Sequence, residues 1–404
     1  PFLALDMPVT ASLTSEIADD GTLRGGSVTA VLGAGFLRVL GKAQDGIFID
    51  EGALRLRYDA ATRIVSIDNS ELFSGQSRAT LSGQIVGAQH DGADPDLWRY
   101  SLSAKDVKLG SVDVRVEPIN VDLMTAQGGI DLAHGFYTPD RGAFVAGAVG
   151  LALSGHMSLG GDAPRIRLAG SFSPMTTSAL KSIWPQFLMK DARKWVLKNV
   201  ADGRVTGATL IADLDREALE RIKARQPLAP EMLNFTFGFK DLSFSYIDDM
   251  PLLQGLAGTG ELSGSSFTVL AENGHVPVPG GGRIEVANGR FEIPNVEPKI
   301  PDGGVSVALS GATPDLLRLL DHEPLGALKG TGLAPGVFGG TGAVALRVAM
   351  PSRENLACGA VILQAAAELV DVSAQALFAG HAMSDGRSLI NSKAGVASLA
   401  GEPR

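Results

Sequence analysis

Cysteine, aromatic residues and long apolar runs are all scarce in this chain, and each shortage excludes a class of protein. Cys358 is the single cysteine among 404 residues, so an internal disulfide is impossible and stability must come from hydrogen bonds and burial. Aromatic residues make up 6% of the chain, whereas glycine occurs 50 times, which favours many turns over a bulky aromatic core. The longest apolar run, residues 143–153, is shorter than the roughly 20 residues that a membrane-spanning helix needs.

Excess positive charge and the usual catalytic patterns are missing as well. The net charge of -9 argues against a protein that binds nucleic acid by neutralising its phosphates. The 6 histidines are scattered, and none lies at metal-ligand spacing from another. No serine occupies a nucleophile-elbow pattern, and the adjacent Asp248 and Asp249 would face opposite ways on a strand. We therefore expect no enzymatic activity, no catalytic residues, no metal and no cofactor.

An alternation of apolar and polar residues runs through most of the chain. In the clearest example, Leu233, Phe235, Phe237 and Phe239 alternate with polar residues or glycine. Successive side chains of a strand point to opposite faces, so this spacing predicts strands with one apolar and one polar face. The pattern recurs often enough to predict a mostly β protein, an antiparallel meander of roughly twenty strands.

Two glycine-containing segments are predicted to be turns. Asn288–Gly289 lies between two alternating runs, which is a strong signal for a two-residue hairpin. The segment 258–260, Gly-Thr-Gly, is only superficially like a phosphate-binding loop, because no helix follows at the right distance. We expect a turn there too.

Near the middle of the chain the apolar period changes from strand-like to helical. Thr177 can cap a first short helix, a second can run from Asp191 to a stop at Gly203, and Asp215 can open a third. Farther on, Thr313 and Pro314 predict a helix with Thr as its cap. The expected organisation is a β segment at 1–173, a helical insert at 174–226, a second β segment at 227–352 with a short helix at 314–322, and the start of a further, truncated β segment at 353–404.

The helical insert is locally basic within an acidic chain. Its basic and tryptophan residues, Trp184, Arg193, Lys194 and Trp195 among them, could cap the sheet or rest on anionic headgroups. In the alternative interpretation, which the narrow apolar stripe favours, the tryptophans pack on the sheet while the basic side chains face water.

Several stretches together resemble a known family. They are Ser182–Pro185, 192–196, 203–208, the Tyr-ending strand with its Pro-Leu element at 242–252, and the short helix at 313–325. In these stretches the chain is similar to the YhdP-type central domain of the AsmA-like proteins of Gram-negative envelopes, and the likeness is firmest over 174–325.

The resemblance implies a fold, a location and a function. TamB- and YhdP-type relatives form an elongated, curved β-sheet bent into a trough with an apolar interior, and are thought to carry phospholipid from the inner to the outer membrane. For this chain it implies a periplasmic monomer held at the inner membrane by an anchor outside the chain. The implied partners are phospholipid acyl chains and other envelope proteins, and no nucleic acid. The family has no catalytic residues.

The residues expected to line such a trough are those of the apolar face. They are Val112, Val114, Val116, Leu233, Phe235, Phe237, Phe239, Phe244, Ile284 and Val286. Alternation alone does not distinguish a lipid-binding trough from ordinary sandwiches whose apolar faces cover each other. A structural or adhesive β protein that binds a protein or glycan is therefore the alternative function, and a carbohydrate-active protein would need a facing carboxylate pair that we cannot nominate.

Overall fold

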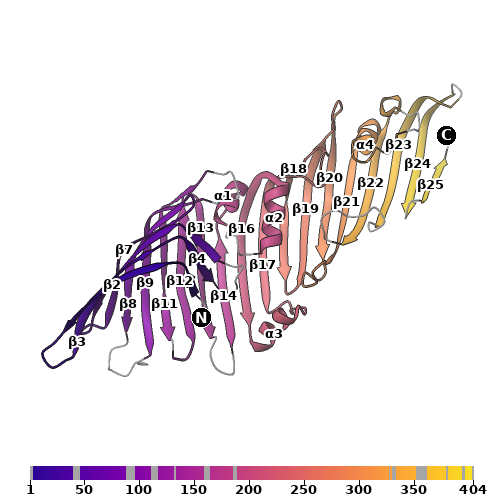
Figure 1. Cartoon of the computed structure of the whole chain (residues 1–404). Coiled ribbons are helices and arrows are strands. Elements are labelled where there is room, and N and C mark those ends of the chain that lie inside the picture. Colours follow the sequence, from indigo (N-terminus) through magenta and orange to yellow (C-terminus); the bar gives the residue numbers. More distant parts are fainter. Residues whose placement is uncertain are drawn as a thin grey trace. The chain divides into compact units, whose positions relative to one another are not determined.

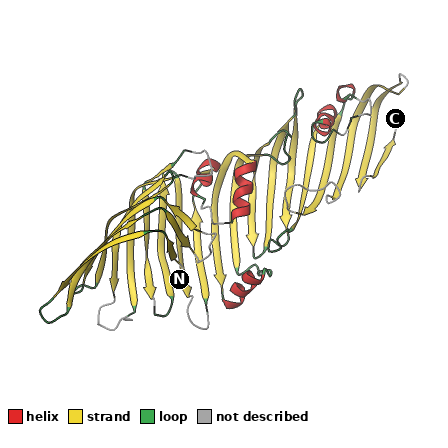
Figure 2. Cartoon of the chain, viewed as in Figure 1, coloured by secondary structure: helices red, strands yellow, loops and turns green. Residues whose placement is uncertain are grey.

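The mostly β prediction is confirmed. The computed structural model describes residues 3–39, 46–87, 96–110, 117–131, 133–158, 164–184, 189–326, 328–329, 334–351, 362–378, 381–393 and 396–402. These residues form one large antiparallel sheet that is not closed, with four short α-helices (Figure 2). Its outermost strands, β2 and β25, each pair with a single described neighbour (Figure 1).

The chain forms two compact units. Unit 1 comprises Pro1–Lys198 and Gly207–Glu220, and unit 2 comprises Asn199–Thr206 and Arg221–Arg404. The strand β16 (Val200–Leu214) contributes residues to both units.

Unit 1 is an antiparallel sheet in which most strands pair with the next strand along the chain. Its strands are β2 (Val9–Ile17), β3 (Leu23–Leu32), β6 (Glu51–Asp59), β7 (Ile64–Ser74), β8 (Ser77–Gly87), β9 (Leu97–Leu109), β10 (Ile119–Val121), β11 (Leu123–Asp131), β12 (Phe136–Ala146), β13 (Val149–Ser158), β14 (Arg165–Phe172), β15 (Met175–Thr176) and part of β16. A separate three-stranded sheet consists of β1 (Leu3–Asp6), β4 (Gly35–Val39) and β5 (Gly46–Ile49).

Cross-strand register separates apolar from polar residues in unit 1. One row of directly paired residues crosses the sheet from β2 to β16 and consists only of apolar residues and glycine: Leu13, Val28, Leu56, Ile67, Gly83, Leu102, Ala126, Gly142, Leu153, Gly170 and Leu210. A row on the other face is polar throughout: Thr14, Ser27, Arg57, Ser66, Gln84, Ser101, Gln127 and Arg141. Paired residues share a face, so the alternation in sequence becomes one apolar face and one polar face.

The three central helices are short, and their ends differ in part from the prediction. The first helix, α1 (Thr177–Ile183), is capped by Thr176, whose Oγ1 accepts a hydrogen bond from the N–H of Ala179 at 3.2 Å. The second, α2 (Lys190–Asn199), ends before Gly203, which lies inside β16 with a φ of 134°. The predicted stop at Gly203 is therefore wrong, because this glycine supplies unusual strand geometry instead. The region 174–226 accordingly contains the long strand β16 as well as helices.

The third helix begins as expected. Asp215 precedes α3 (Arg216–Ala224), and its Oδ1 accepts a hydrogen bond from the N–H of Ala218 at 2.9 Å. This is the standard way in which an N-cap carboxylate satisfies a free helix donor.

Unit 2 continues the same pattern with longer strands. They are β17 (Leu233–Phe244), β18 (Leu253–Ser263), β19 (Ser266–Pro277), β20 (Arg283–Ile293), β21 (Asp302–Ala312), β22 (Thr341–Pro351), β23 (Ile362–Phe378), β24 (His381–Lys393) and β25 (Val396–Glu402). A 3-10 turn, η1 (Pro335–Val337), precedes β22. Each strand is antiparallel to the next.

Both segments predicted as turns lie inside strands. Asn288 and Gly289 are part of β20, and the register with β21 shifts between Ala287 and Arg290. Asn288 has a φ of 50°, so the left-handed conformation expected in a hairpin here forms a β-bulge. The segment 258–260 lies within β18. Both turn predictions are wrong for the same reason. Glycine and asparagine occur not only in turns but also in β-bulges and where two backbones approach closely, so these residue types alone do not identify a turn.

One helix packs on the sheet of unit 2. The helix α4 (Thr313–Asp321) begins directly after β21, with Ala312 rather than Thr313 in the N-cap position, so the predicted cap is displaced by one residue. Its buried Leu316 and Leu319 join Ile284 and Val286 in the main buried cluster of this unit. The helix ends before Pro324, as the sequence predicted.

Candidate functional site

The apolar face of unit 2 carries most of the residues predicted to line a trough. One row of directly paired residues crosses it from β17 to β22: Phe237, Gly260, Val269, Phe291, Val305 and Val348. The adjacent row on the other face reads Thr236, Glu261, Thr268, Glu292, Gly304 and Ala349. A molecule lying along the first row therefore meets only hydrocarbon side chains and glycine.

Five phenylalanines form a continuous group on this face, here called the phenylalanine cluster: Phe235, Phe237, Phe239, Phe267 and Phe291. The ring centroid of Phe237 lies 5.7 Å from Phe235, 6.4 Å from Phe239 and 6.5 Å from Phe267, and Phe267 lies 6.2 Å from Phe291. These spacings are typical of attractive aromatic pairs. Among the five, only Phe239 is fully buried, so the other rings keep partly exposed surface.

Two glycines of β18 make room for this cluster. A Cβ placed on Gly260 would lie within 2.8 Å of three atoms of the Phe237 ring. One placed on Gly258 would collide with the backbone oxygen of Leu270 on β19 and lie 2.9 Å from the Cζ of Phe239. The rings therefore lie across β18 in direct contact with its backbone. This explains why Gly258 and Gly260 occur in mid-strand, where glycine is otherwise unfavourable.

The end of the face near α4 is covered by protein. Ile284 is 0% exposed and Val286 is 4% exposed, and both pack in the cluster with Leu316 and Leu319. These two predicted lining residues thus lie beneath a helix, whereas Phe235 and Phe237 do not belong to that cluster. In unit 2, α4 packs on β20, β21 and β22, and η1 contacts β23.

A tyrosine hydroxyl is buried at the same end without a partner. Tyr246 packs against the α4 cluster, and its hydroxyl has no hydrogen bond among the described residues. Burial raises the pKa of Tyr246 to about 12, because the charged phenolate is poorly solvated there. The side chain therefore stays protonated at any physiological pH.

The remaining predicted lining residues have different positions. Leu233 and Phe244 are partly buried at the two ends of β17. Val112, Val114 and Val116 lie outside the described residues. Phe267, Phe291 and the two glycines of β18 were missed, although the same alternation around 267–271 and 291–293 contained the signal.

In the helical insert, one of the predicted basic residues is buried and one of the predicted tryptophans is half exposed. Arg193 is buried, and its Nε donates a hydrogen bond to the carbonyl oxygen of Trp184 at 3.1 Å. Arg193 therefore ties α2 to the end of α1. Trp195 is 51% exposed, and Lys194 is exposed beside it. The interpretation in which all basic side chains of the insert face water is therefore wrong for Arg193.

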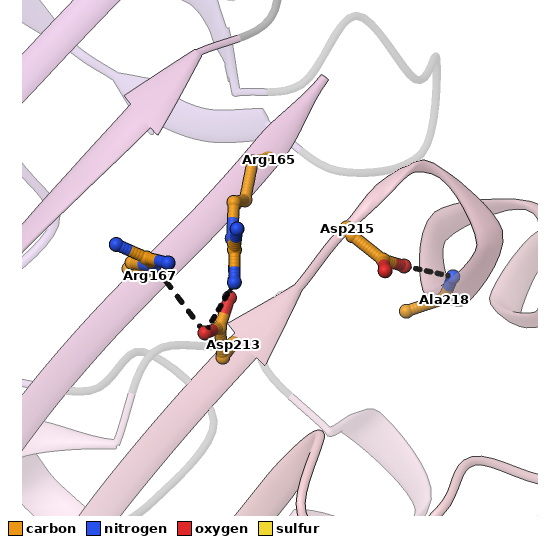
Figure 3. A network of polar contacts seen from close by, with 5 residues as sticks. All are labelled: Arg165, Arg167, Asp213, Asp215 and Ala218. Carbon is orange, nitrogen blue, oxygen red and sulfur yellow. Dashed lines mark hydrogen bonds and ion pairs between the residues drawn. The ribbon is translucent and has the colours of Figure 1, made fainter. Parts of the chain in front are cut away.

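The polar face of unit 1 carries an ion-pair network rather than a site for chemistry. Arg165 contacts both carboxylate oxygens of Asp213 at 2.7 Å, and Arg167 donates to the same carboxylate at 3.3 Å (Figure 3). The guanidinium of Arg165 holds the pKa of Asp213 below its usual range. The groups are largely solvent-accessible, so we assign them a modest role in joining β14 to β16.

Within the described residues, no group of three or more acidic, histidine or cysteine side chains could hold a metal ion. Over the same residues, no helix has the length and apolarity to cross a membrane. Comparison with protein-family models, curated proteins and solved structures finds no match to the chain.

Proposed function

We propose that this protein binds phospholipid acyl chains on the apolar face of its sheet and carries phospholipid between the inner and outer membranes of a Gram-negative envelope. The observation that carries the proposal is the unbroken apolar register, which spans β17 to β22 in unit 2 and β2 to β16 in unit 1. In this proposal the face shelters hydrocarbon tails and has no catalytic part.

The energetics of acyl chains fit such a face. Each methylene removed from water contributes about 0.8 kcal/mol, so a diacyl lipid with roughly thirty methylenes is retained even when only part of its chains is covered. A smooth surface of small aliphatic residues and flat rings offers nearly equivalent positions along its length. Movement between equivalent positions changes the free energy little, which favours transport over tight storage.

The proposed location and partners come from the resemblance to AsmA-like proteins. They comprise the periplasm, an inner-membrane anchor outside the chain and other envelope proteins. The alternative, a structural or adhesive protein, uses the same sheet but leaves the apolar face without lipid.

Lipid extraction from vesicles tests the proposal. The purified protein is incubated with vesicles of phosphatidylethanolamine and phosphatidylglycerol, separated by flotation and examined by native mass spectrometry. We expect the protein to carry diacyl phospholipid. Protein recovered free of lipid, at concentrations where a known lipid-transfer protein is loaded, would count against the proposal and favour the structural alternative.

A further inference from the structure

The helix α2 has a basic side that acyl-chain binding by the sheet does not use. Lys190, Lys194 and Lys198 recur every four residues, so their side chains lie along one side of the helix, here called the lysine side. All three lysines are exposed, and the exposed Asp191 is the one acidic residue of the helix. Three lysines against one aspartate leave an excess of two positive charges here, in a chain whose net charge is -9.

Two large apolar side chains are exposed beside these lysines. Trp195 lies three residues before Lys198, hence next to it on the helix surface, and is 51% exposed. Met189, directly before the helix, is 53% exposed. Tryptophan is highly buried on average in folded proteins. Its ring suits a boundary between water and hydrocarbon, where the apolar part is covered and the N–H meets polar groups.

Contacts on the opposite side hold α2 in its orientation. Arg193 is 5% exposed, and its Nε donates a hydrogen bond at 3.1 Å to the carbonyl oxygen of Trp184, at the end of α1. The same side of the helix carries three partly buried apolar residues, Ala192, Val196 and Leu197. With 3.6 residues per turn, this side lies opposite the lysine side. The helix is therefore fixed with its lysines and Trp195 toward the solvent.

We propose that the lysine side of α2, together with Trp195, docks this protein on the anionic phospholipid headgroups of a membrane surface. Charge complementarity selects this occupant, because a surface of repeated phosphates attracts clustered cations even when the chain as a whole is acidic. The indole ring adds an apolar contact at the level of the headgroups. The proposal goes beyond acyl-chain binding by the sheet, because docking on headgroups does not require a lipid to leave the membrane.

Removal of three positive charges at two different places tests the docking. The test variant combines Lys190→Gln, Lys194→Gln and Lys198→Gln. The control variant combines three exposed positions in and just after α3, Arg216→Gln, Lys223→Gln and Arg225→Gln. The net charge of the protein changes equally in both. Binding is measured by sedimentation with vesicles of phosphatidylcholine and phosphatidylglycerol, and circular dichroism checks that each variant is folded.

The expected difference between the two variants is large. One lysine near an anionic membrane contributes roughly fivefold to affinity, so we expect the test variant to bind on the order of a hundredfold more weakly than the native protein. The control variant should bind within a few-fold of the native protein. High salt should release the native protein, and pure phosphatidylcholine vesicles should bind it weakly. Equal weakening of both variants, or equal binding of the native protein to neutral and anionic vesicles, would overturn the proposal. Retained binding of the test variant would do so as well, and would favour an acidic protein as the partner of the lysine side.

Tryptophan fluorescence tests the contact at Trp195. Anionic vesicles that contain phosphatidylcholine brominated near the headgroup should quench the native protein. The variant Trp195→Phe, which keeps Trp98 and Trp184, should lose most of this quenching. Equal quenching of the two proteins would contradict the proposed contact.

Failure of this proposal is distinguishable from failure of the proposed function. Protein that binds anionic vesicles through α2 but is recovered without lipid would contradict acyl-chain binding alone. Protein that carries lipid but binds vesicles equally well without the three lysines would contradict the docking alone.

Discussion

Replacing Phe237 by aspartate separates an open lipid-binding face from an ordinary core. The ring of Phe237 is partly buried, in contact with the backbone of β18 and 5.7–6.5 Å from three other rings. Losing that burial costs about 2 kcal/mol of folding free energy. On an open face the new carboxylate keeps its water, so the much larger penalty for burying a charge does not apply. We expect Phe237→Asp to unfold in urea with a loss of about 2 kcal/mol.

The same substitution should affect lipid binding more strongly. One ring spacing of about 6 Å corresponds to roughly five methylenes of an extended acyl chain, so lifting a chain off this position costs about 4 kcal/mol, or close to a thousandfold in affinity. Vesicle extraction of fluorescent phospholipid measures this loss, with Thr236→Asp, on the polar face of the same strand, as the matched control. Two results together would refute the reasoning. The free energy of unfolding would fall by about 5 kcal/mol or more, and lipid capture would fall only in proportion to the amount of folded protein.

Three further predictions concern packing and ionisation in unit 2. Gly260→Val should destabilise the fold by about 1–3 kcal/mol through collision with Phe237, and a double-mutant cycle with Phe237→Ala should recover part of that loss in urea unfolding. Leu316→Ala should cost about 2–4 kcal/mol in thermal or urea unfolding, whereas Leu320→Ala, at a 48% exposed position of the same helix, should cost less than about 0.5 kcal/mol; equal losses would contradict the docking of α4. Tyr246→Phe should match or exceed the native stability at pH 7, because it removes a buried hydroxyl without a partner. The folded pKa of Tyr246 is about 12, above the ordinary value of 10.0, so the native protein should lose stability as the pH rises from 10 toward 12 and the phenylalanine variant should lose less; identical pH profiles would contradict this assignment.

The positions of the strands and the residues that share a face were predictable from the sequence, because both depend on the spacing of nearby residues. The alternation at 233–239 correctly predicted the strand and the shared face of its phenylalanines. Asp215 correctly predicted a helix start, since a cap depends on residues three apart. Gly258, Gly260 and Asn288 were misjudged because strands distant in sequence decide whether such a residue makes a turn, a bulge or room for a ring.

For the candidate site, the sequence predicted the apolar residues of single strands but not which residues of different strands lie side by side. Periodicity identified Phe235 and Phe237, but the register that brings Phe267 and Phe291 beside them is a property of pairing across β18 and β19. Periodicity also placed Ile284 on the right face without revealing that α4 covers it. Charge gave no warning that Arg193 is buried, because its partner is a backbone carbonyl.

Photocrosslinking from the phenylalanine cluster tests the central claim most directly. A benzophenone amino acid replaces Phe267 on the apolar face or Thr268 on the polar face, and each protein is illuminated after exposure to radiolabelled phospholipid in vesicles. The proposed function predicts strong labelling from position 267 and background labelling from position 268. Equal labelling from both positions, or none from position 267, would contradict it.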